Sequence, residues 1–203
     1  MSTAPKSEFV TVEDYLLAEE KAHSRSEYIE GWVRAMSGGT VRHNQVKVNC
    51  TILFGIALKG KPCRPFDSDM MLRIRKQNGT RFYYPDLQVI CESNAATERF
   101  QDLPVLIMEV LSPSTRQYDL DEKLNAYLKI NSLECYIILE QHTPSVIVLR
   151  RTPQGFLRET YEGLEAVIEL PFLGVSLALR DIYDGVEFSA TCVQESEEEY
   201  EIA

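Results

Sequence analysis

The sequence predicts an α/β (α+β) fold in which helices flank a mixed β-sheet and additional β-hairpins extend the structure. Three observations support this prediction. Short apolar runs with β-branched residues, such as 84–90 and 105–111, are typical of buried strands. They alternate with segments such as 41–58, whose dense apolar residues predict a helix. Asn78-Gly79, between two strand-like segments, is a strong signal for a hairpin.

In the first half of the chain, caps and turn residues separate the predicted elements. Thr11 is a suitable N-cap, with Asp14 three residues later, and predicts a first helix. Residues 26–31 end in a glycine turn before a short strand. The segment 41–58 is apolar enough to predict a largely buried helix. Strands are expected at 32–36, 63–67, 69–75 and 81–84, followed by the run at 84–90.

In the second half, a polar connection at 92–102 separates the two apolar runs, and a helix is expected at 120–130. Spacing by four places Asp119, Lys123 and Tyr127 on one face of this helix. Beyond it the pattern again predicts strands, and then a last short helix. The strands are expected at 134–139 and 145–151, a hairpin at 156–161 and 166–170, and the helix at 177–182.

Length and composition predict one globular domain. The chain has 203 residues, of which 44% are hydrophobic and 26% are charged, and no linker is long enough to divide it. We expect a single domain at 10–190, a flexible N-terminal segment at 1–9 and an acidic C-terminal tail at 191–203. The net charge is −10, and five of the glutamates lie in that tail. The acidic remainder counts against a large phosphate-binding face, although it leaves room for a local basic cleft.

The sequence also predicts a cytoplasmic protein without a membrane segment. Its start has no basic region followed by an apolar run, as a signal peptide would have. No apolar stretch approaches the length of a membrane span. The five cysteines are widely spaced and include no CxxC pair. We therefore expect small core residues in a reducing compartment, and neither disulfides nor a zinc site.

Two carboxylates are unusual because they occur in apolar, strand-like runs. Asp86 lies at the start of one run, and Glu109 lies deep within the other. A buried carboxylate is costly unless it is paired, hydrogen-bonded or bound to a metal. If the two strands are neighbours, the carboxylates converge, and such oxygen donors suit a hard cation such as Mg²⁺. Alternatively, Glu109 meets a buried arginine or a helix N-terminus and has only a structural role.

Six short segments carry a common pattern: SEYIEG (26–31), SGGTVRHN (37–44), SDM (68–70), YYPD (83–86), EVLSPST (109–115) and YDLDEKLNAYLK (118–129). Together they resemble the Uma2 family, which belongs to the PD-(D/E)XK nuclease superfamily. The resemblance extends from about Val10 to Ile182. It implies a restriction-endonuclease-like fold and a metal-dependent endonuclease that hydrolyses phosphodiester bonds in DNA with Mg²⁺ or Mn²⁺. We also expect a homodimer, so that two sites can address the two DNA strands.

The resemblance also implies roles for individual residues. By position, Pro85-Asp86 matches the PD of the superfamily and Glu109 matches its second acidic residue. Glu27 resembles the helix-borne acid that often completes the metal site. The backbone carbonyl of Val110 is implied as a further metal ligand.

One residue departs from the superfamily pattern. The motif E-x-K requires lysine at position 111, where this chain has Leu111. Lys123, on the helix that follows, is the natural substitute, and would orient the attacking water or neutralise charge on the phosphate. Alternatively, Lys123 is a surface lysine paired with Asp119 one turn earlier, a contact of little energetic value.

Two further residues are secondary candidates for the site. His43, near the start of a helix, either contacts the phosphate or the attacking water, or is a structural hydrogen-bonding residue. Asp69 either braces the site from a neighbouring strand or makes only a turn contact. A basic lip is expected from Arg42, Arg73, Arg75 and Lys76, unless Arg73 and Arg75 are merely the solvated face of a strand.

Two other functions fit the same sequence. A non-catalytic binding or assembly protein with the nuclease fold is favoured by the acidic composition and by Leu111. A metal-dependent hydrolase of another phosphate ester suits an acidic surface better than duplex DNA does. The carboxylates Glu27, Asp86 and Glu109 favour the endonuclease, because a degenerate site need not keep three costly groups together.

Overall fold

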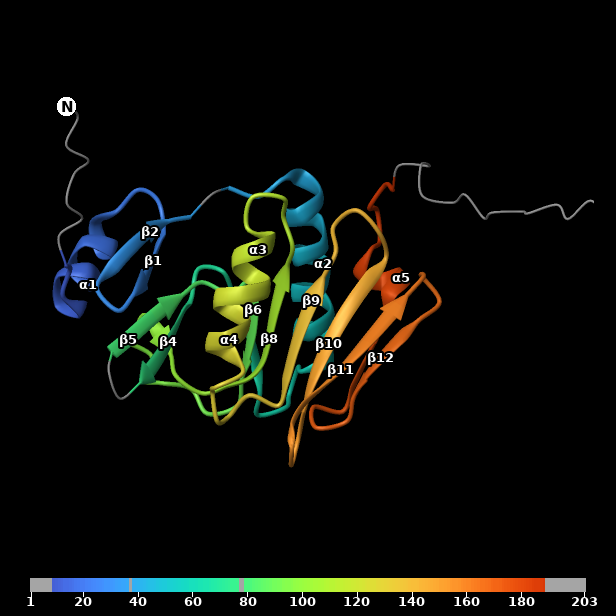
Figure 1. The fold of residues 1–203 in the computed structure, drawn as a ribbon. Helices are drawn as coiled ribbons and strands as arrows, with labels where there is room; N and C mark the ends of the chain where they lie inside the picture. The colour runs from blue at the N-terminus through green and yellow to red at the C-terminus, as the bar shows by residue number, and fades with distance from the viewer. Residues whose placement is uncertain (1–8, 37, 77–78, 189–203) are drawn as a thin grey trace, which may run out of the picture.

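The described part of the chain is built from β-sheets with helices packed against them (Figure 1). The computed structural model describes residues 9–36, 38–76 and 79–188. The predicted acidic tail, and all of the predicted N-terminal segment except Phe9, lie outside these residues. The sheets contain both antiparallel and parallel pairs, which confirms the predicted α/β (α+β) fold class.

The larger sheet runs through the middle of the molecule (Figure 1). Its strands are β3 (Arg64–Asp67), β6 (Leu87–Ile90), β8 (Pro104–Val110), β9 (Cys135–Leu139), β10 (Ser145–Thr152) and β11 (Gly155–Glu162). They lie in the order β11-β10-β9-β8-β6-β3, and each neighbouring pair is antiparallel except β8 and β9. A parallel pair needs a crossover connection, and the chain supplies a helical one between β8 and β9.

Helices cover both faces of this sheet because its central strands are apolar on both sides (Figure 1). One face is covered by α2 (Val41–Ala57) and the other by the crossover, which comprises α3 (Arg116–Tyr118), the π-helical turn η1 (Asp119–Lys123) and α4 (Leu124–Tyr127). In β8, Met108 and Val110 pack in the core on the α2 side, whereas Ile107 packs on the crossover side. Glu109 alternates with Met108 and Val110, so its side chain faces the crossover helix.

The second sheet and α1 (Val12–Lys21) surround an aromatic core. Thr11 caps α1 as predicted, because its side chain accepts a hydrogen bond from the Asp14 N–H (3.1 Å). The predicted hairpin is present, although its turn at 77–78 lies outside the described residues. The strands are β1 (Ser26–Ile29), β2 (Trp32–Ala35), β4 (Met71–Lys76), β5 (Gly79–Tyr83) and β7 (Phe100–Gln101), in the order β2-β1-β5-β4-β7.

Several predicted elements need correction. The segment expected as a polar connection contains β7, whose two residues are too few to show a pattern. The hairpin expected between 156–161 and 166–170 is wrong, because β11 pairs with β10, and β12 (Val167–Leu170) pairs with β13 (Val175–Ala178). Alternating polarity identifies a strand but not its partner. The last helix, α5 (Leu179–Ile182), begins two residues later than expected because β13 occupies the preceding residues.

The prediction that α2 is largely buried is also wrong. Val46, Cys50 and Phe54 are fully buried against the sheet, but Val41 and Ile56 are 89% and 71% exposed. Only the stripe that faces the sheet is covered, because no second layer packs over the opposite side of α2 among the described residues.

The cysteine prediction fails for one pair. Cys63 and Cys91 form a disulfide, whereas Cys50 and Cys135 are free and buried. Cys63 precedes β3 and Cys91 follows β6, and these antiparallel strands pair Arg64 with Ile90, which brings the two cysteines opposite each other. A separation of 28 residues in sequence gives no sign of this pairing. Among the described helices, none combines the length and apolarity that crossing a membrane requires.

Candidate active site

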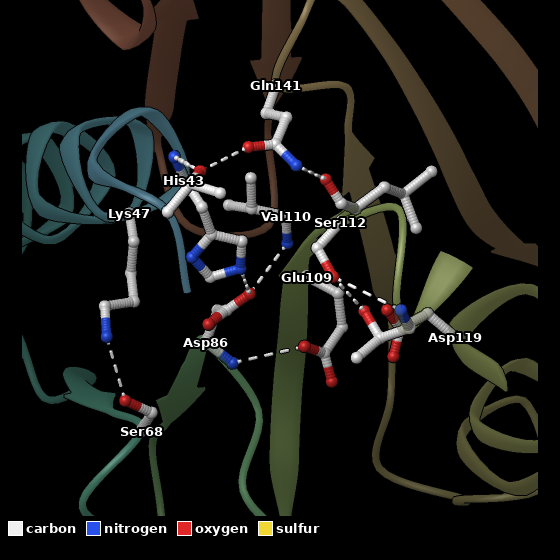
Figure 2. A network of polar contacts seen from close by, with 12 residues as sticks. His43, Lys47, Ser68, Asp86, Glu109, Val110, Ser112, Asp119 and Gln141 are labelled. Carbon is white, nitrogen blue, oxygen red and sulfur yellow. Dashed lines mark hydrogen bonds and ion pairs between the residues drawn. The ribbon is translucent and has the colours of Figure 1, made fainter. Parts of the chain in front are cut away.

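Asp86 and Glu109 converge because the strands that carry them are neighbours. Asp86 directly precedes β6, Glu109 lies in β8, and the antiparallel register places Leu87 opposite Met108. The Asp86 N–H donates to Glu109 Oε2 over 3.4 Å, and both side chains line one small pocket of about 70 Å³. The two residues are 9% and 3% exposed, so two buried acidic groups lie close together (Figure 2).

Lys123 reaches the Glu109 carboxylate from the crossover helix. Its Nζ donates to Glu109 Oε1 over 3.0 Å, and the Tyr127 hydroxyl donates to the same oxygen over 2.9 Å. Lys123 is 6% exposed and therefore is not a surface lysine. Asp119 Oδ1 lies 3.5 Å from Lys123 Nζ, so the three residues spaced by four do share a face beside Glu109. Leu111, at the position where the superfamily pattern has lysine, packs in the core on this side of the sheet.

Glu27 lies on strand β1, and the expectation of a helix-borne acid is therefore wrong. Its Oε1 is 3.2 Å from Lys123 Nζ and has no hydrogen-bond partner among the described residues. Glu27 lines a second pocket of about 60 Å³, which shares Lys123 with the Asp86 pocket but not Asp86 itself. The structure thus brings Glu27 to the lysine, although Glu27 does not line the pocket that contains Asp86.

His43 contacts Asp86 from the first turn of α2. The Thr40 side chain caps this helix by accepting from the His43 N–H (3.1 Å). The His43 Nε2 lies 3.2 Å from Asp86 Oδ2, and the Val110 N–H donates to the same oxygen over 2.8 Å (Figure 2). One oxygen of Asp86 is therefore held from both sides, by α2 and by β8.

Burial and close charges move the pKa values of these groups in different directions. Burial alone would raise the pKa of Asp86, but the contacts with His43 and the Val110 N–H together hold it below its usual value. Burial raises the pKa of Glu109 to about 8. The negative charge of Asp86 also raises this pKa, whereas the positive charge of Lys123 lowers it. Burial would lower the pKa of Lys123, but Glu109, Glu27 and Asp119 raise it well above its usual value.

The remaining predicted residues lie apart from this pocket. Asp69 has a side chain that is 83% exposed, approaches Arg25 at 3.6 Å and lines a different pocket. Arg73 forms a bidentate pair with Asp102 (2.7 Å for both bonds) rather than a basic lip. Arg75 lines the pocket beside Arg73, and Lys76 lies 3.7 Å from Glu30. Of the expected lip, Arg42 alone lies on the helix that carries His43.

Sequence reasoning missed Gln141, which lies two residues after β9 and is 1% exposed. Its Nε2 donates to the Leu111 carbonyl over 2.9 Å, and its Oε1 accepts from the Thr40 hydroxyl over 2.7 Å (Figure 2). A single glutamine in a loop has no periodicity or motif that marks it. Only the three-dimensional structure shows that it joins the end of β8 to the start of α2.

The donor set of the pocket fits a hard divalent cation. Asp86 and Glu109 offer carboxylate oxygens, and Val110 lines the same pocket through the strand that carries Glu109. The described residues contain no group of three or more His, Cys, Asp or Glu side chains placed to hold a metal ion. A cation would therefore depend on the two carboxylates together with the Val110 carbonyl and water.

Comparison with known proteins agrees with this fold. The family model Uma2, described as "Putative restriction endonuclease", matches residues 12–180. The chain belongs to the Uma2 family. Two uncharacterised proteins of Synechocystis are each 31% identical to it, over 87% and 86% of this chain and over 92% and 100% of the relative. The fold also matches a crystal structure of a "putative nuclease belonging to DUF820" from Anabaena variabilis, with a TM-score of 0.68 and 20% sequence identity. The match covers 86% of this chain and 97% of the other, and it shows that the two proteins share a fold.

Proposed function

We propose that this protein is a metal-dependent endonuclease that hydrolyses phosphodiester bonds in DNA. The observation that carries the proposal is the position of Lys123. Its ammonium group lies 3.0 Å from the Glu109 carboxylate and lines the pocket shared by Glu109 and Asp86. A lysine from the crossover helix would thus supply the ammonium group that position 111, occupied here by Leu111, does not provide. The family description as a restriction endonuclease supports the same activity and substrate.

Asp86, Glu109 and the Val110 carbonyl would hold Mg²⁺ or Mn²⁺, which when bound lowers the pKa of a water molecule and stabilises charge on the phosphate. Lys123 has a raised pKa and stays protonated, so its role is electrostatic and not that of a general base. Glu27 and Asp119 hold this ammonium group in place at 3.2 and 3.5 Å. His43, whose Nε2 lies 3.2 Å from Asp86 Oδ2, would contact the phosphate or the attacking water from this side of the pocket.

A homodimer completes the proposal, because cleavage of both strands of a duplex needs two sites in opposite orientation. Sedimentation equilibrium on the protein alone and on the protein with duplex DNA would measure the oligomeric state. A dimer in either sample is expected, and a monomer in both would restrict the activity to nicking.

The central test combines metal binding with plasmid nicking. We expect Mg²⁺ and Mn²⁺ to bind the wild-type protein in a calorimetric titration, and the same samples to nick supercoiled plasmid. Asp86→Asn, which keeps the shape of the side chain, should lose metal binding and lower nicking on the order of a hundredfold or more. An absence of metal binding in the wild type would contradict the proposal. Metal binding without nicking would instead direct the search to another phosphate ester.

A matched pair of lysine variants tests the role of Lys123. Lys123→Met should lower nicking on the order of a hundredfold, because the charge on the phosphate loses the ammonium group beside Glu109. Lys129→Met, at an exposed residue in the turn that follows α4, should leave nicking unchanged. Equal effects of the two variants would show that Lys123 contributes only general positive charge.

A further inference from the structure

Gln141 closes a ring of polar contacts that contains His43 and Asp86. Starting at β8, the Leu111 carbonyl accepts from Gln141 Nε2 (2.9 Å), and Gln141 Oε1 accepts from the Thr40 hydroxyl (2.7 Å). The Thr40 side chain accepts from the His43 N–H (3.1 Å), and His43 Nε2 lies 3.2 Å from Asp86 Oδ2. The Asp86 oxygen accepts from the Val110 N–H (2.8 Å), and the peptide bond to Leu111 completes the ring.

The ring determines the orientation of the Gln141 amide. The Leu111 carbonyl can only accept, so the amide nitrogen of Gln141 must face it. The amide oxygen then faces the Thr40 hydroxyl, which donates to it and accepts from the His43 N–H. A glutamate of the same size at 141 could serve the Thr40 contact but not the Leu111 contact.

The ring also connects segments that are distant in sequence. Gln141 lies 101 residues from Thr40 and 30 residues from Leu111. Gln141 is 1% exposed, so its amide loses its hydrogen bonds to water when the protein folds. The contacts with Thr40 and Leu111 replace those bonds, and without them the buried amide would be unsatisfied. Among the described residues, Gln141 is the side chain that bonds both to the cap of α2 and to the end of β8.

We infer that Gln141 is a positioning residue, which holds His43 against Asp86 by fixing the start of α2 relative to the end of β8. The inference rests on the proposed function where it concerns hydrolysis, because His43 is there the group directed at the phosphate. It predicts that loss of either half of the bridge, at Gln141 or at Thr40, displaces the His43 ring. Residues that position an active group in this way typically contribute tenfold to a hundredfold to activity.

The test uses four variants with matched geometry. Gln141→Glu removes the bond to Leu111, and Thr40→Val removes the hydroxyl at nearly constant shape. Thr40→Ser keeps the hydroxyl and should therefore keep the wild-type position of the His43 ring and the wild-type nicking activity. The control is Asn49→Asp, on the same helix, because Asn49 also accepts from a side chain (Gln45, 2.9 Å) and donates to backbone carbonyls (Ile182, 2.9 Å; Asp184, 2.8 Å). Asn49→Asp therefore removes an amide donor to backbone carbonyls, as Gln141→Glu does, but at a residue outside the ring.

Two readouts separate this inference from the proposed function. Nuclear magnetic resonance of the His43 imidazole in the metal-free protein should show shifted ring signals in Gln141→Glu and Thr40→Val. The signals should stay at their wild-type positions in Thr40→Ser and Asn49→Asp. Plasmid nicking at saturating Mg²⁺ should fall about tenfold or more in the first two variants and not in the last two.

The outcomes that overturn the inference are equally specific. If the His43 signals keep their wild-type positions in both Gln141→Glu and Thr40→Val, Gln141 does not position His43. The same follows if Asn49→Asp moves them as far as Gln141→Glu does, since the effect is then a general loss of stability. An absence of nicking in the wild-type protein overturns the proposed function alone, because the signals of the metal-free protein still decide the role of Gln141.

Discussion

At the scale of single residues, the site is dominated by an imbalance of buried charge. The carboxylates of Glu27, Asp86, Glu109 and Asp119 are each less than 10% exposed, and Lys123 is the buried amine among them. Lys123 lies within 3.5 Å of three of these groups, and His43 contacts the fourth. Such an excess of acidic groups is stable only if some carboxyls are protonated or if a cation enters. Burial raises the pKa values of Glu109 and Asp119, so these are the two carboxyls of the cluster that favour protonation.

The pKa of Glu109 predicts how stability depends on pH. Its value rises from 4.5 to about 8 on folding, so between these values the folded state binds the extra proton. The free energy of unfolding of the metal-free protein should therefore fall as the pH rises from about 5 to about 8. Glu109→Gln, which cannot ionise, should lose less stability over this range, by on the order of 1 kcal/mol or more. Urea unfolding in a chelating buffer measures both slopes.

Asp86 provides an internal check on this comparison. Its pKa is lowered, so its contribution to stability is lost only below its usual value of 3.8, outside the range of the experiment. The difference between the wild type and Glu109→Gln therefore reports Glu109 itself. Parallel pH profiles for the two proteins would show that Glu109 is ionised in the fold.

At the scale of elements, neighbouring strands create the site and a π-helical turn supplies its lysine. The pairing of β6 with β8 brings the two carboxylates together, and the β8–β9 crossover passes over the same face. The turn from Asp119 to Lys123 is π-helical, a distortion often found at functional sites. The π-helical turn ends at Lys123, which contacts Glu109, and the regular α-helix begins at the next residue, Leu124.

The disulfide between Cys63 and Cys91 should stabilise the pairing of β3 with β6, and hence the strand that follows Asp86. Cys63→Ser together with Cys91→Ser should lower the free energy of unfolding by roughly 3 kcal/mol, since the bond closes a loop of 28 residues in sequence. Urea unfolding measures this difference, and wild-type protein kept in reductant should match the double variant. In the oxidised wild type, a thiol-specific label applied after unfolding should modify Cys50 and Cys135 but neither Cys63 nor Cys91.

Some elements and site residues could be predicted because their signals are local. A cap at Thr11, the apolar runs around Asp86 and Glu109, and the spacing of Lys123 from Tyr127 are all visible within a few residues. The position of Glu27 on a strand could not be predicted in this way, because a four-residue strand beside a turn has too little pattern to be distinguished from a helix. Contacts that depend on tertiary pairing, such as the Gln141 bridge, have no signal in one sequence.

At the scale of the whole molecule, the acidic composition limits how DNA can approach. The net charge is −10, so the molecule as a whole repels a DNA strand. The sequence of α2 contains Arg42 and Lys47 and no acidic residue, and this helix places His43 at the pocket. Lys47 bonds to Ser68 over 3.0 Å, beside the segment that leads into β4 (Figure 2). The N-terminal half of α2 is therefore the face by which we expect DNA to reach the site.

This expectation predicts a local and salt-dependent contribution to DNA binding. Affinity for a short duplex, measured by fluorescence anisotropy without divalent metal, should fall steeply as salt rises. Arg42→Ala with Lys47→Ala should weaken binding and reduce the slope of log affinity against log salt by roughly 2, one contact for each residue. Arg158→Ala, on the exposed strand β11, should change neither quantity. If the wild type binds no duplex even at low salt, DNA is not the substrate, and a small phosphate ester, which an acidic surface repels less, becomes the better candidate for the Asp86–Glu109 pocket.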